Sequence, residues 1–239
     1  MQVQVFDLPR SVTEMQVHHK TVIVIDVLRA TSSITTAIES GAKQVIPALD
    51  PGEAIALYGK LGRGDSLLAG ERGGLKLPDF DLGNSPLEFS PQKVRDKTVI
   101  FSTTNGTNAI LAARNAAELF IGCMRNRTAA AKAALATGND ILLLCAGTEG
   151  MFSADDICCA GAIVDAISQL ASEPVGYTDL ARVSRLIYTQ WRDGQADLSQ
   201  TYHYARLSKL GFQEDLAYCF QTDVTDAVPR YANGVVVAK

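Results

Sequence analysis

The stretch TVIVIDVLRATSSITTAI, residues 21–38, decides the fold class of this chain. Its first part, residues 22–25, is a continuous apolar run that ends on Asp26, as in a buried strand that stops at a polar site. A short turn containing Arg29 follows, and hydroxyl side chains then begin an apparent helix that Gly41 ends. Strand, turn and helix in this order predict one unit of an α/β fold.

The polar residues of this unit favour two kinds of ligand. Arg29 and the free N–H groups at the helix start attract an anion, and the hydroxyls of Thr31 and Ser32 offer further hydrogen bonds. The carboxylate of Asp26 favours a hard cation such as Mg²⁺. We therefore expect a metal-assisted phosphate site, with an Asp26 that only accepts hydrogen bonds from a neighbouring turn as the alternative.

The same alternation continues to about residue 170. Further strand patterns occur at residues 43–49, 66–69, 97–102, 117–122 and 140–145, and helix patterns separate them. Asp50 and Ser153 are the expected caps of two of these helices. The alternation predicts a three-layer α/β sandwich, with a mostly parallel or mixed central sheet and helices on both faces. From about residue 176 the pattern is mainly helical, and without a convincing linker we expect a single domain over residues 1–239.

Residues 70–86, GERGGLKLPDFDLGNSP, show no periodic pattern and are rich in Gly, Pro, Asp and Asn. A loop of this length inside a compact domain is usually functional or disordered. Apolar residues recur within it, so we expect an ordered functional loop.

Composition limits the partners and the location of the chain. An acidic chain of 239 residues, with a net charge of −4 and a sequence pI of about 5.4, is not expected to bind nucleic acid. No segment reaches the roughly 18–20 apolar residues of a membrane span, and the start of the chain lacks the features of a signal peptide. Five cysteines without regular spacing indicate reduced thiols. We expect a cytoplasmic protein with no nucleic-acid or membrane partner, and the sequence leaves open whether it forms a homo-oligomer.

Ligands of parallel α/β sheets bind at the carboxyl ends of the strands, and polar residues follow most of the strands predicted here. Besides those in residues 26–32, they are Glu71, Arg72, Ser102, Thr103, Thr104, Asn105, Gly106, Cys123, Arg125, Asn126, Cys145, Gly147, Thr148, Glu149, Asp155 and Asp156. Arginines beside acids in Gly-rich turns suit phosphate, because the guanidinium group matches phosphate oxygens. Structural alternatives are surface charge for the arginines, a helix cap for residues 102–107 and the helix dipole for the two aspartates. We expect these groups to converge on one crevice.

Several longer motifs make the chain similar to one known family. They are VIVIDVLRATSSI (22–34), GERGG (70–74), FDLGNSPLE (80–88), STTNGT (102–107), CAGTEG (145–150), SADDICCAGAI (153–163) and DVTDAVPRY (223–231). With these motifs the sequence resembles the 2-phosphosulfolactate phosphatase family, magnesium-dependent acid phosphatases of the coenzyme M pathway.

The resemblance implies hydrolysis of the phosphate ester of 2-phosphosulfolactate, or of a related small phosphorylated acid, to the alcohol and phosphate. The expected ligands of Mg²⁺ are two or more of Asp26, Glu71, Asp155 and Asp156. The expected catalytic residues are Asp26, Arg29 and Arg72. The expected substrate-binding residues are Thr31, Ser32, Ser102, Thr103, Thr104, Asn105, Gly106, Arg125 and Asn126. Attack by water or by a carboxylate is left open, and a non-catalytic sensor of a small anionic metabolite is the alternative function.

Overall fold

The central sheet consists of two parallel sets of strands joined by an antiparallel hairpin. The computed structural model describes residues 1–62 and 64–239. Its strands are β1 (Gln2–Phe6), β2 (Thr21–Ile25), β3 (Gln44–Pro47), β4 (Ser66–Arg72), β5 (Leu75–Lys76), β6 (Thr98–Ser102), β7 (Glu118–Gly122), β8 (Ile141–Cys145), β9 (Gly176–Tyr177), β10 (Arg230–Ala232) and β11 (Val235–Val237).

The strand order in the sheet is β5-β4-β6-β3-β11-β10-β7-β2-β8-β1-β9. One parallel set is β4, β6 and β3, and the other is β7, β2, β8, β1 and β9. The hairpin β10–β11 lies between them and pairs antiparallel with β7 on one side and with β3 on the other. The predicted α/β class with a mixed central sheet is therefore confirmed.

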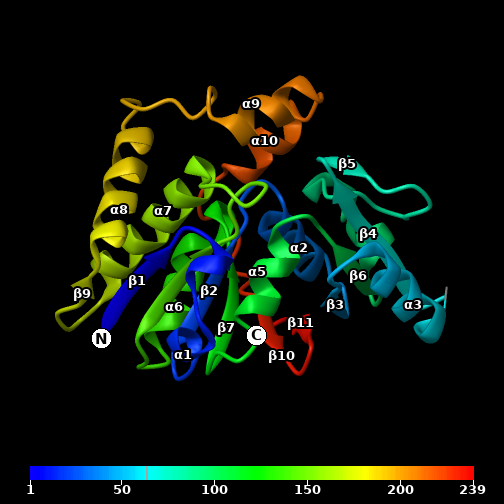
Figure 1. Cartoon of the computed structure of the whole chain (residues 1–239), viewed down its shortest axis with the longest axis horizontal. Coiled ribbons are helices and arrows are strands. Elements are labelled where there is room, and N and C mark those ends of the chain that lie inside the picture. Colours follow the sequence, from blue (N-terminus) through cyan, green and yellow to red (C-terminus); the bar gives the residue numbers. More distant parts are fainter. Residues whose placement is uncertain (63) are drawn as a thin grey trace.

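Helices alternate with the strands along the chain (Figure 1). They are α1 (Glu14–Val17), α2 (Ala30–Glu39), α3 (Pro51–Leu61), α4 (Pro91–Val94), α5 (Gly106–Ala112), α6 (Arg127–Leu135), α7 (Ala154–Leu170), α8 (Asp179–Arg192), α9 (Tyr202–Lys209) and α10 (Gln213–Cys219). Asp50 and Ser153 cap α3 and α7 as predicted, each accepting a backbone N–H with its side chain. None of the helices in residues 1–62 and 64–239 combines the length and the apolar character needed to cross a membrane.

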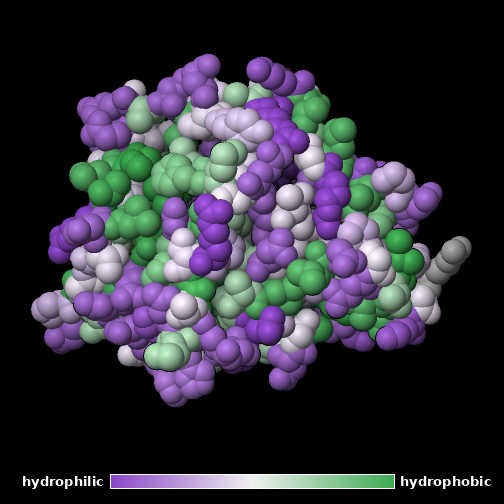
Figure 2. Space-filling view, in the orientation of Figure 1, coloured by the Kyte–Doolittle hydropathy of each residue, from purple (hydrophilic) through white to green (hydrophobic). Residues whose placement is uncertain are grey.

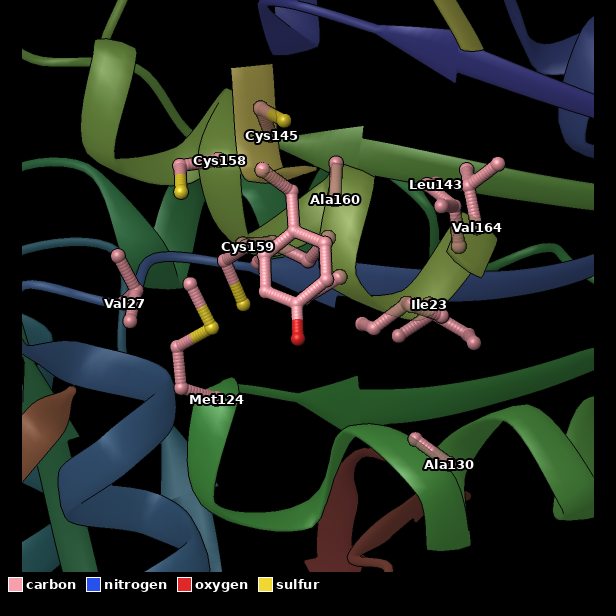
Figure 3. Packing of buried hydrophobic residues seen from close by; sticks show 14 of the residues in the cluster. Ile23, Val27, Met124, Ala130, Leu143, Cys145, Cys158, Cys159, Ala160 and Val164 are labelled. Carbon is pink, nitrogen blue, oxygen red and sulfur yellow. The ribbon is translucent and has the colours of Figure 1, made fainter. Parts of the chain in front are cut away.

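Strand β2 shows why helices cover both faces. All five of its residues are buried. Ile23 and Ile25 belong to the core shared with α6, α7 and α8, part of which Figure 3 shows. Val22 and Val24 belong to the core shared with α2 and α5. Because successive side chains of a strand point to opposite faces, each face of β2 needs its own layer of helices.

The segment expected to be a loop, residues 70–86, is ordered and partly extended. Strand β4 continues through Arg72, turns at Gly73 and Gly74, and returns as the short strand β5. Both glycines have positive φ angles, +64° and +87°, which a glycine adopts without strain. The apolar pattern did not reveal this tight turn, which places the backbone N–H of Gly74 2.7 Å from Oε2 of Glu71.

Helices α9 and α10 lie across one end of the molecule. Figure 1 shows them at the top, above the turns that connect the strands to α2 and α7. They are the part of the chain that closes the region where the strand ends of both sets meet.

We predict that Gly161→Ala strongly destabilises the protein. A Cβ at this position of α7 would lie 1.9 Å from the carbonyl oxygen of Ser184 in α8, so the two helices would have to separate. The free energy of unfolding should fall by about 3 kcal/mol, measured by urea denaturation. In the control Gly59→Ala, where a Cβ on α3 meets nothing within 4 Å, it should rise by about 0.5–1 kcal/mol. Equal effects of the two substitutions would contradict this prediction.

Candidate active site

A cavity opens where turns from both strand sets meet helix α9. The empty space between its walls, including the open mouth, is about 420 Å³. Its lining comes from distant parts of the chain, namely Asp26, Leu28, Arg29, Glu71, Gly73, Gly74, Asn84, Thr104, Asn105, Thr148, Glu149, His203, Arg206 and Leu207. In the space-filling view, hydrophilic side chains cover most of the surface just below α9 and α10 (Figure 2).

Asp26 follows β2 and is almost completely buried in the wall of this cavity. Its backbone N–H donates to the hydroxyl of Thr31 at 3.1 Å, and its Oδ1 accepts the N–H of Ala30 at 3.4 Å. Gly106, the first residue of α5, leaves room for the other oxygen, because a Cβ there would lie 2.8 Å from Oδ2. The start of α2 and the missing side chain of Gly106 together hold the carboxylate in place.

Glu71, near the end of β4, is the second buried carboxylate of the cavity. Its Oε2 accepts the N–H of Gly74 at 2.7 Å, and its Oε1 accepts the N–H of Thr104 at 2.8 Å. Burial, and after it the charge of Glu71, raises the pKa of Asp26 to about 7. Two buried carboxylates that repel one another favour a proton or a cation between them.

Arg29 also lines the cavity, but its charge is already paired. Its Nη1 donates to Oδ2 of Asp215 in α10 at 2.6 Å, and its Nη2 donates to the carbonyl oxygen of Gly74 at 2.6 Å. Its guanidinium carbon lies 4.1 Å from the centre of the Phe212 ring. One side chain thus links the start of α2, the turn after β4 and the C-terminal helices.

Two oxygen atoms in the cavity wall have no hydrogen-bond partner within the part of the chain that the structure describes. They are Oδ1 of Asn84 and Oγ1 of Thr104, and both are buried. Buried polar side-chain atoms in proteins nearly always have a partner. These two oxygens therefore indicate contact with a ligand or with ordered water.

The chain matches known proteins along almost its whole length. A family model described as 2-phosphosulpholactate phosphatase matches residues 6–234. The chain belongs to the 2-phosphosulfolactate phosphatase family. A protein of Caldanaerobacter subterraneus subsp. tengcongensis, named probable 2-phosphosulfolactate phosphatase, is 43% identical over 99% of this chain and 98% of its own length. Proteins of the same name from Clostridium acetobutylicum and Clostridium beijerinckii are 38% identical over 95% of each chain and 36% identical over 100% of each chain.

In this member of the family, only some of the residues predicted from the sequence meet at the cavity. Those that line it are Asp26, Arg29, Glu71, Thr104 and Asn105. The side chain of Asn105 accepts the N–H of Glu149 at 3.1 Å, which joins the turn after β6 to the turn after β8.

Other predicted residues lie behind the cavity wall. The hydroxyl of Ser32 donates to a carbonyl of the preceding turn at 2.9 Å. Arg72 donates to the hydroxyl of Ser102 at 3.1 Å and to its carbonyl oxygen at 3.4 Å, so its guanidinium lies along β6 rather than in the cavity lining. The hydroxyl of Thr103 accepts the N–H of Thr107 at 3.2 Å. These contacts shape the turns that carry Asp26, Glu71 and Thr104.

Asp156 fastens two of these turns together. One of its carboxylate oxygens accepts the N–H of Val27 at 2.9 Å, and the other accepts the N–H of Gly147 at 3.0 Å. Burial, and after it the charge of Asp26, raises the pKa of Asp156 well above its usual range. Asp156 is absent from the cavity lining, and both of its oxygens are occupied by backbone donors.

Asp155 is absent from the lining of this cavity and lines a neighbouring one together with His203. Its carboxylate accepts hydrogen bonds from the hydroxyls of Thr201, at 2.9 Å, and Ser153, at 3.3 Å. Its Oδ2 lies 3.7 Å from Nδ1 of His203. Burial raises the pKa of Asp155 to about 6.

The predicted residues after β7 lie away from the cavity. The guanidinium carbon of Arg125 is 3.7 Å from the centre of the Tyr218 ring, and its Nη2 lies 3.5 Å from a carboxylate oxygen of Glu39. Asn126 is fully buried and accepts the N–H of Cys123 at 2.9 Å. These three contacts fix the turn that follows β7 and are part of the packing of the fold.

Helix α9 supplies cavity residues that were not predicted from the sequence. His203, Arg206 and Leu207 line the cavity, and spacings of three and four residues place them on one face of the helix. Arg206 pairs with Glu149 and donates to the carbonyl oxygen of Gly73 at 3.2 Å. The helical spacing is visible in the sequence, but no local pattern tells which element that face meets.

Four further residues of the site lie outside helix α9. They are Asn84, Thr148, Glu149 and Asp215. Thr148 and Glu149 were among the strand-end groups expected to converge, whereas Asn84 and Asp215 were not. The first three lie inside motifs shared with the family, FDLGNSPLE and CAGTEG, so the resemblance contained a signal for them. Asp215 had no such signal, since only its ion pair with Arg29 identifies it.

We predict that the substitution Asp26→Asn stabilises the protein more at pH 8 than at pH 4, when EDTA is present to remove metal ions. The folded-state pKa of Asp26 is about 7, against a usual value of 3.8, so the native protein becomes less stable as the pH rises between these values. The variant has no carboxyl group at this position, so it does not lose this part of its unfolding free energy as the pH rises. The difference in unfolding free energy between variant and parent should grow by roughly 2–4 kcal/mol between pH 4 and pH 8.

Asp193→Asn is the matched control for this experiment. Asp193 is exposed, and its hydrogen bond and ion pair with Arg192 lower its pKa, so the sign of its effect is opposite. A difference for Asp26→Asn that stays constant from pH 4 to pH 8 would show that its carboxyl group titrates normally.

Proposed function

We propose that this chain hydrolyses the phosphate ester of 2-phosphosulfolactate, or of a closely related phosphorylated acid, to the corresponding alcohol and phosphate. By the resemblance described above, this reaction belongs to the coenzyme M pathway. The observation that carries the proposal is the pair of buried carboxylates, Asp26 and Glu71, in one small cavity with the unpartnered oxygens of Asn84 and Thr104. Such an all-oxygen site suits a phosphoryl group accompanied by a hard cation.

The cation that we propose is Mg²⁺, held by Asp26 and Glu71. Within residues 1–62 and 64–239, no group of three or more His, Cys, Asp or Glu side chains is arranged to hold a metal ion. Mg²⁺ does not need one, because it usually keeps several waters and takes only one or two protein carboxylates. The raised pKa of Asp26 fits this role, since a divalent cation would relieve the repulsion between the two carboxylates.

When bound, Mg²⁺ supplies positive charge to the phosphoryl oxygens, as in other phosphoryl-transfer sites. The residues of the chain do the rest. Arg206 lies at the cavity lining with an accessible side chain and attracts the other anionic groups of the substrate. The hydroxyl oxygen of Thr104 and the amide oxygen of Asn84, which lack partners among the described residues, are available for hydrogen bonds with the substrate or its waters. The positive charge of Arg29 favours an anionic substrate in the cavity, and its ion pair with Asp215 holds α10 in place above the site.

This proposal predicts metal-dependent release of phosphate that needs both carboxylates. Phosphate release from 2-phosphosulfolactate should be seen with Mg²⁺ and should disappear in EDTA. Asp26→Asn and Glu71→Gln should each lower kcat/KM by about 10³-fold or more, because each removes a carboxylate that would hold the Mg²⁺. The surface variant Asp193→Asn should keep the parent rate.

Two results would count against the proposal. Near-normal turnover by Asp26→Asn would show that this carboxylate has no role in the reaction. A rise in melting temperature with phosphate esters, together with no metal-dependent phosphate release from any of them, would instead favour a sensor of an anionic metabolite.

We also predict that Cys123 takes no part in catalysis. Its thiol is fully buried, it is absent from the cavity lining, and burial raises its pKa, all of which disfavour a reactive thiolate. Cys123→Ser should change kcat by less than about threefold. Cys158→Ser, another buried thiol, is the matched control for the cost of a hydroxyl in the core. A large loss of kcat confined to the Cys123 variant, with folding intact, would make Cys123 catalytic.

A further inference from the structure

His203 occupies a wall shared by two cavities. Together with Thr148 it lines the cavity of Asp26 and Glu71, and also a second cavity that contains Asp155 and Thr201. Only 16% of its side chain is accessible. A titratable side chain in this position can pass a proton between the first cavity and the polar groups behind it.

The ring of His203 is oriented by contacts at one of its nitrogens. Nδ1 lies 3.1 Å from the hydroxyl oxygen of Thr148 and 3.7 Å from Oδ2 of Asp155. The carboxylate of Asp155 is in turn held by the hydroxyls of Thr201 and Ser153. Nε2 lies on the opposite side of the ring and makes no hydrogen bond within the described residues. It is therefore the nitrogen available to a ligand.

We propose that His203 is the general acid of the reaction and gives its Nε2 proton to the leaving oxygen of the phosphate ester. Thr148 and Asp155 are then positioning residues that hold Nδ1. This inference rests on the proposed function, since it assigns a step of that hydrolysis to a residue outside the predicted site.

The step balances as follows in atoms and charge. The ester P–O bond breaks, and its electron pair goes to the leaving oxygen, which takes the proton from the imidazolium to become the alcohol. A new P–O bond forms to an oxygen that comes from water. That water gives up a proton to solvent, and the neutral imidazole regains one from solvent. The net reaction is ester plus water to alcohol plus phosphate.

The charges around the ring explain when it carries the proton. Glu71, Glu149 and Asp155 favour the imidazolium form, whereas Arg29 and Arg206 oppose it. In the protein alone, burial and then the charge of Arg29 lower the pKa of His203 to about 4, so the ring is neutral at pH 7. A multiply charged phosphate ester in the cavity brings negative charge next to the ring and favours the imidazolium. For His203 to act as the acid, the bound ester must raise the pKa of the ring enough for it to carry the proton.

The test compares two leaving groups in the variant His203→Gln. An alkyl ester such as 2-phospholactate leaves a strongly basic alkoxide that needs a proton, whereas p-nitrophenyl phosphate leaves a stable phenolate. With Mg²⁺ present, His203→Gln should lower kcat for the alkyl ester by about 10²–10³-fold and for the aryl ester by less than about fivefold. An equal loss for both esters would show a merely structural role and overturn the proposal.

Two further variants separate loss of the acid from damage to helix α9. Lys209→Gln, on the exposed end of the same helix, controls for changes in α9 and should leave both rates unchanged. His203→Ala should regain alkyl-ester hydrolysis with added imidazole and gain little with the aryl ester. If His203→Gln fails to fold by circular dichroism, this rescue decides the question, and its absence in folded His203→Ala would contradict the proposal.

The outcomes also separate this inference from the proposed function. If the parent protein releases phosphate neither from these esters nor from 2-phosphosulfolactate with Mg²⁺, the proposed function fails. If the parent hydrolyses both esters and His203→Gln loses both equally, the function stands and only the assignment of His203 fails.

Discussion

The buried ion pair between Arg29 and Asp215 is the contact on which the shape of the site depends. It joins the first turn of the chain's central unit to a helix almost 190 residues later, at 2.6 Å and with both side chains almost fully buried. Removing one partner of such a pair usually costs about 3–5 kcal/mol, because the other charge is left buried. The same guanidinium holds the turn after β4 through Gly74. The roof of the cavity and the turn that carries Glu71 are therefore fixed by one side chain.

The cavity beneath this pair has two carboxyl groups in its wall that are both buried. Asp26 and Glu71 face the same space, and the cations near them are already engaged, Arg29 by Asp215 and Arg206 by Glu149. In the absence of a ligand, neutral residues at these two positions would give a more stable folded protein than buried carboxylates do. The arrangement makes physical sense if the free energy lost in burying the carboxylates is recovered when a cation binds between them. Function, rather than folding, then accounts for their presence.

The sequence was enough to predict the strand and helix alternation, because apolar runs such as residues 22–25 and caps such as Asp50 and Ser153 act locally. It also predicted the carboxylates at strand ends. It did not distinguish which strand-end groups face the cavity, since Arg72 and Asp156 follow strands as Asp26 does but are held by Ser102 and by backbone donors. Residues such as His203 and Asp215 reach the site only through the packing of α9 and α10, which no pattern within those helices encodes.

The β10–β11 hairpin has a consequence for the order in which the protein forms during synthesis. It is the element that connects the two parallel sets, yet it follows every other strand of residues 1–62 and 64–239 along the chain. Until residues 230–237 leave the ribosome, β7 and β3 each have an unpaired edge, and exposed edges invite pairing with other chains. A nascent chain of this protein is therefore exposed to edge-to-edge pairing until the β10–β11 hairpin has formed.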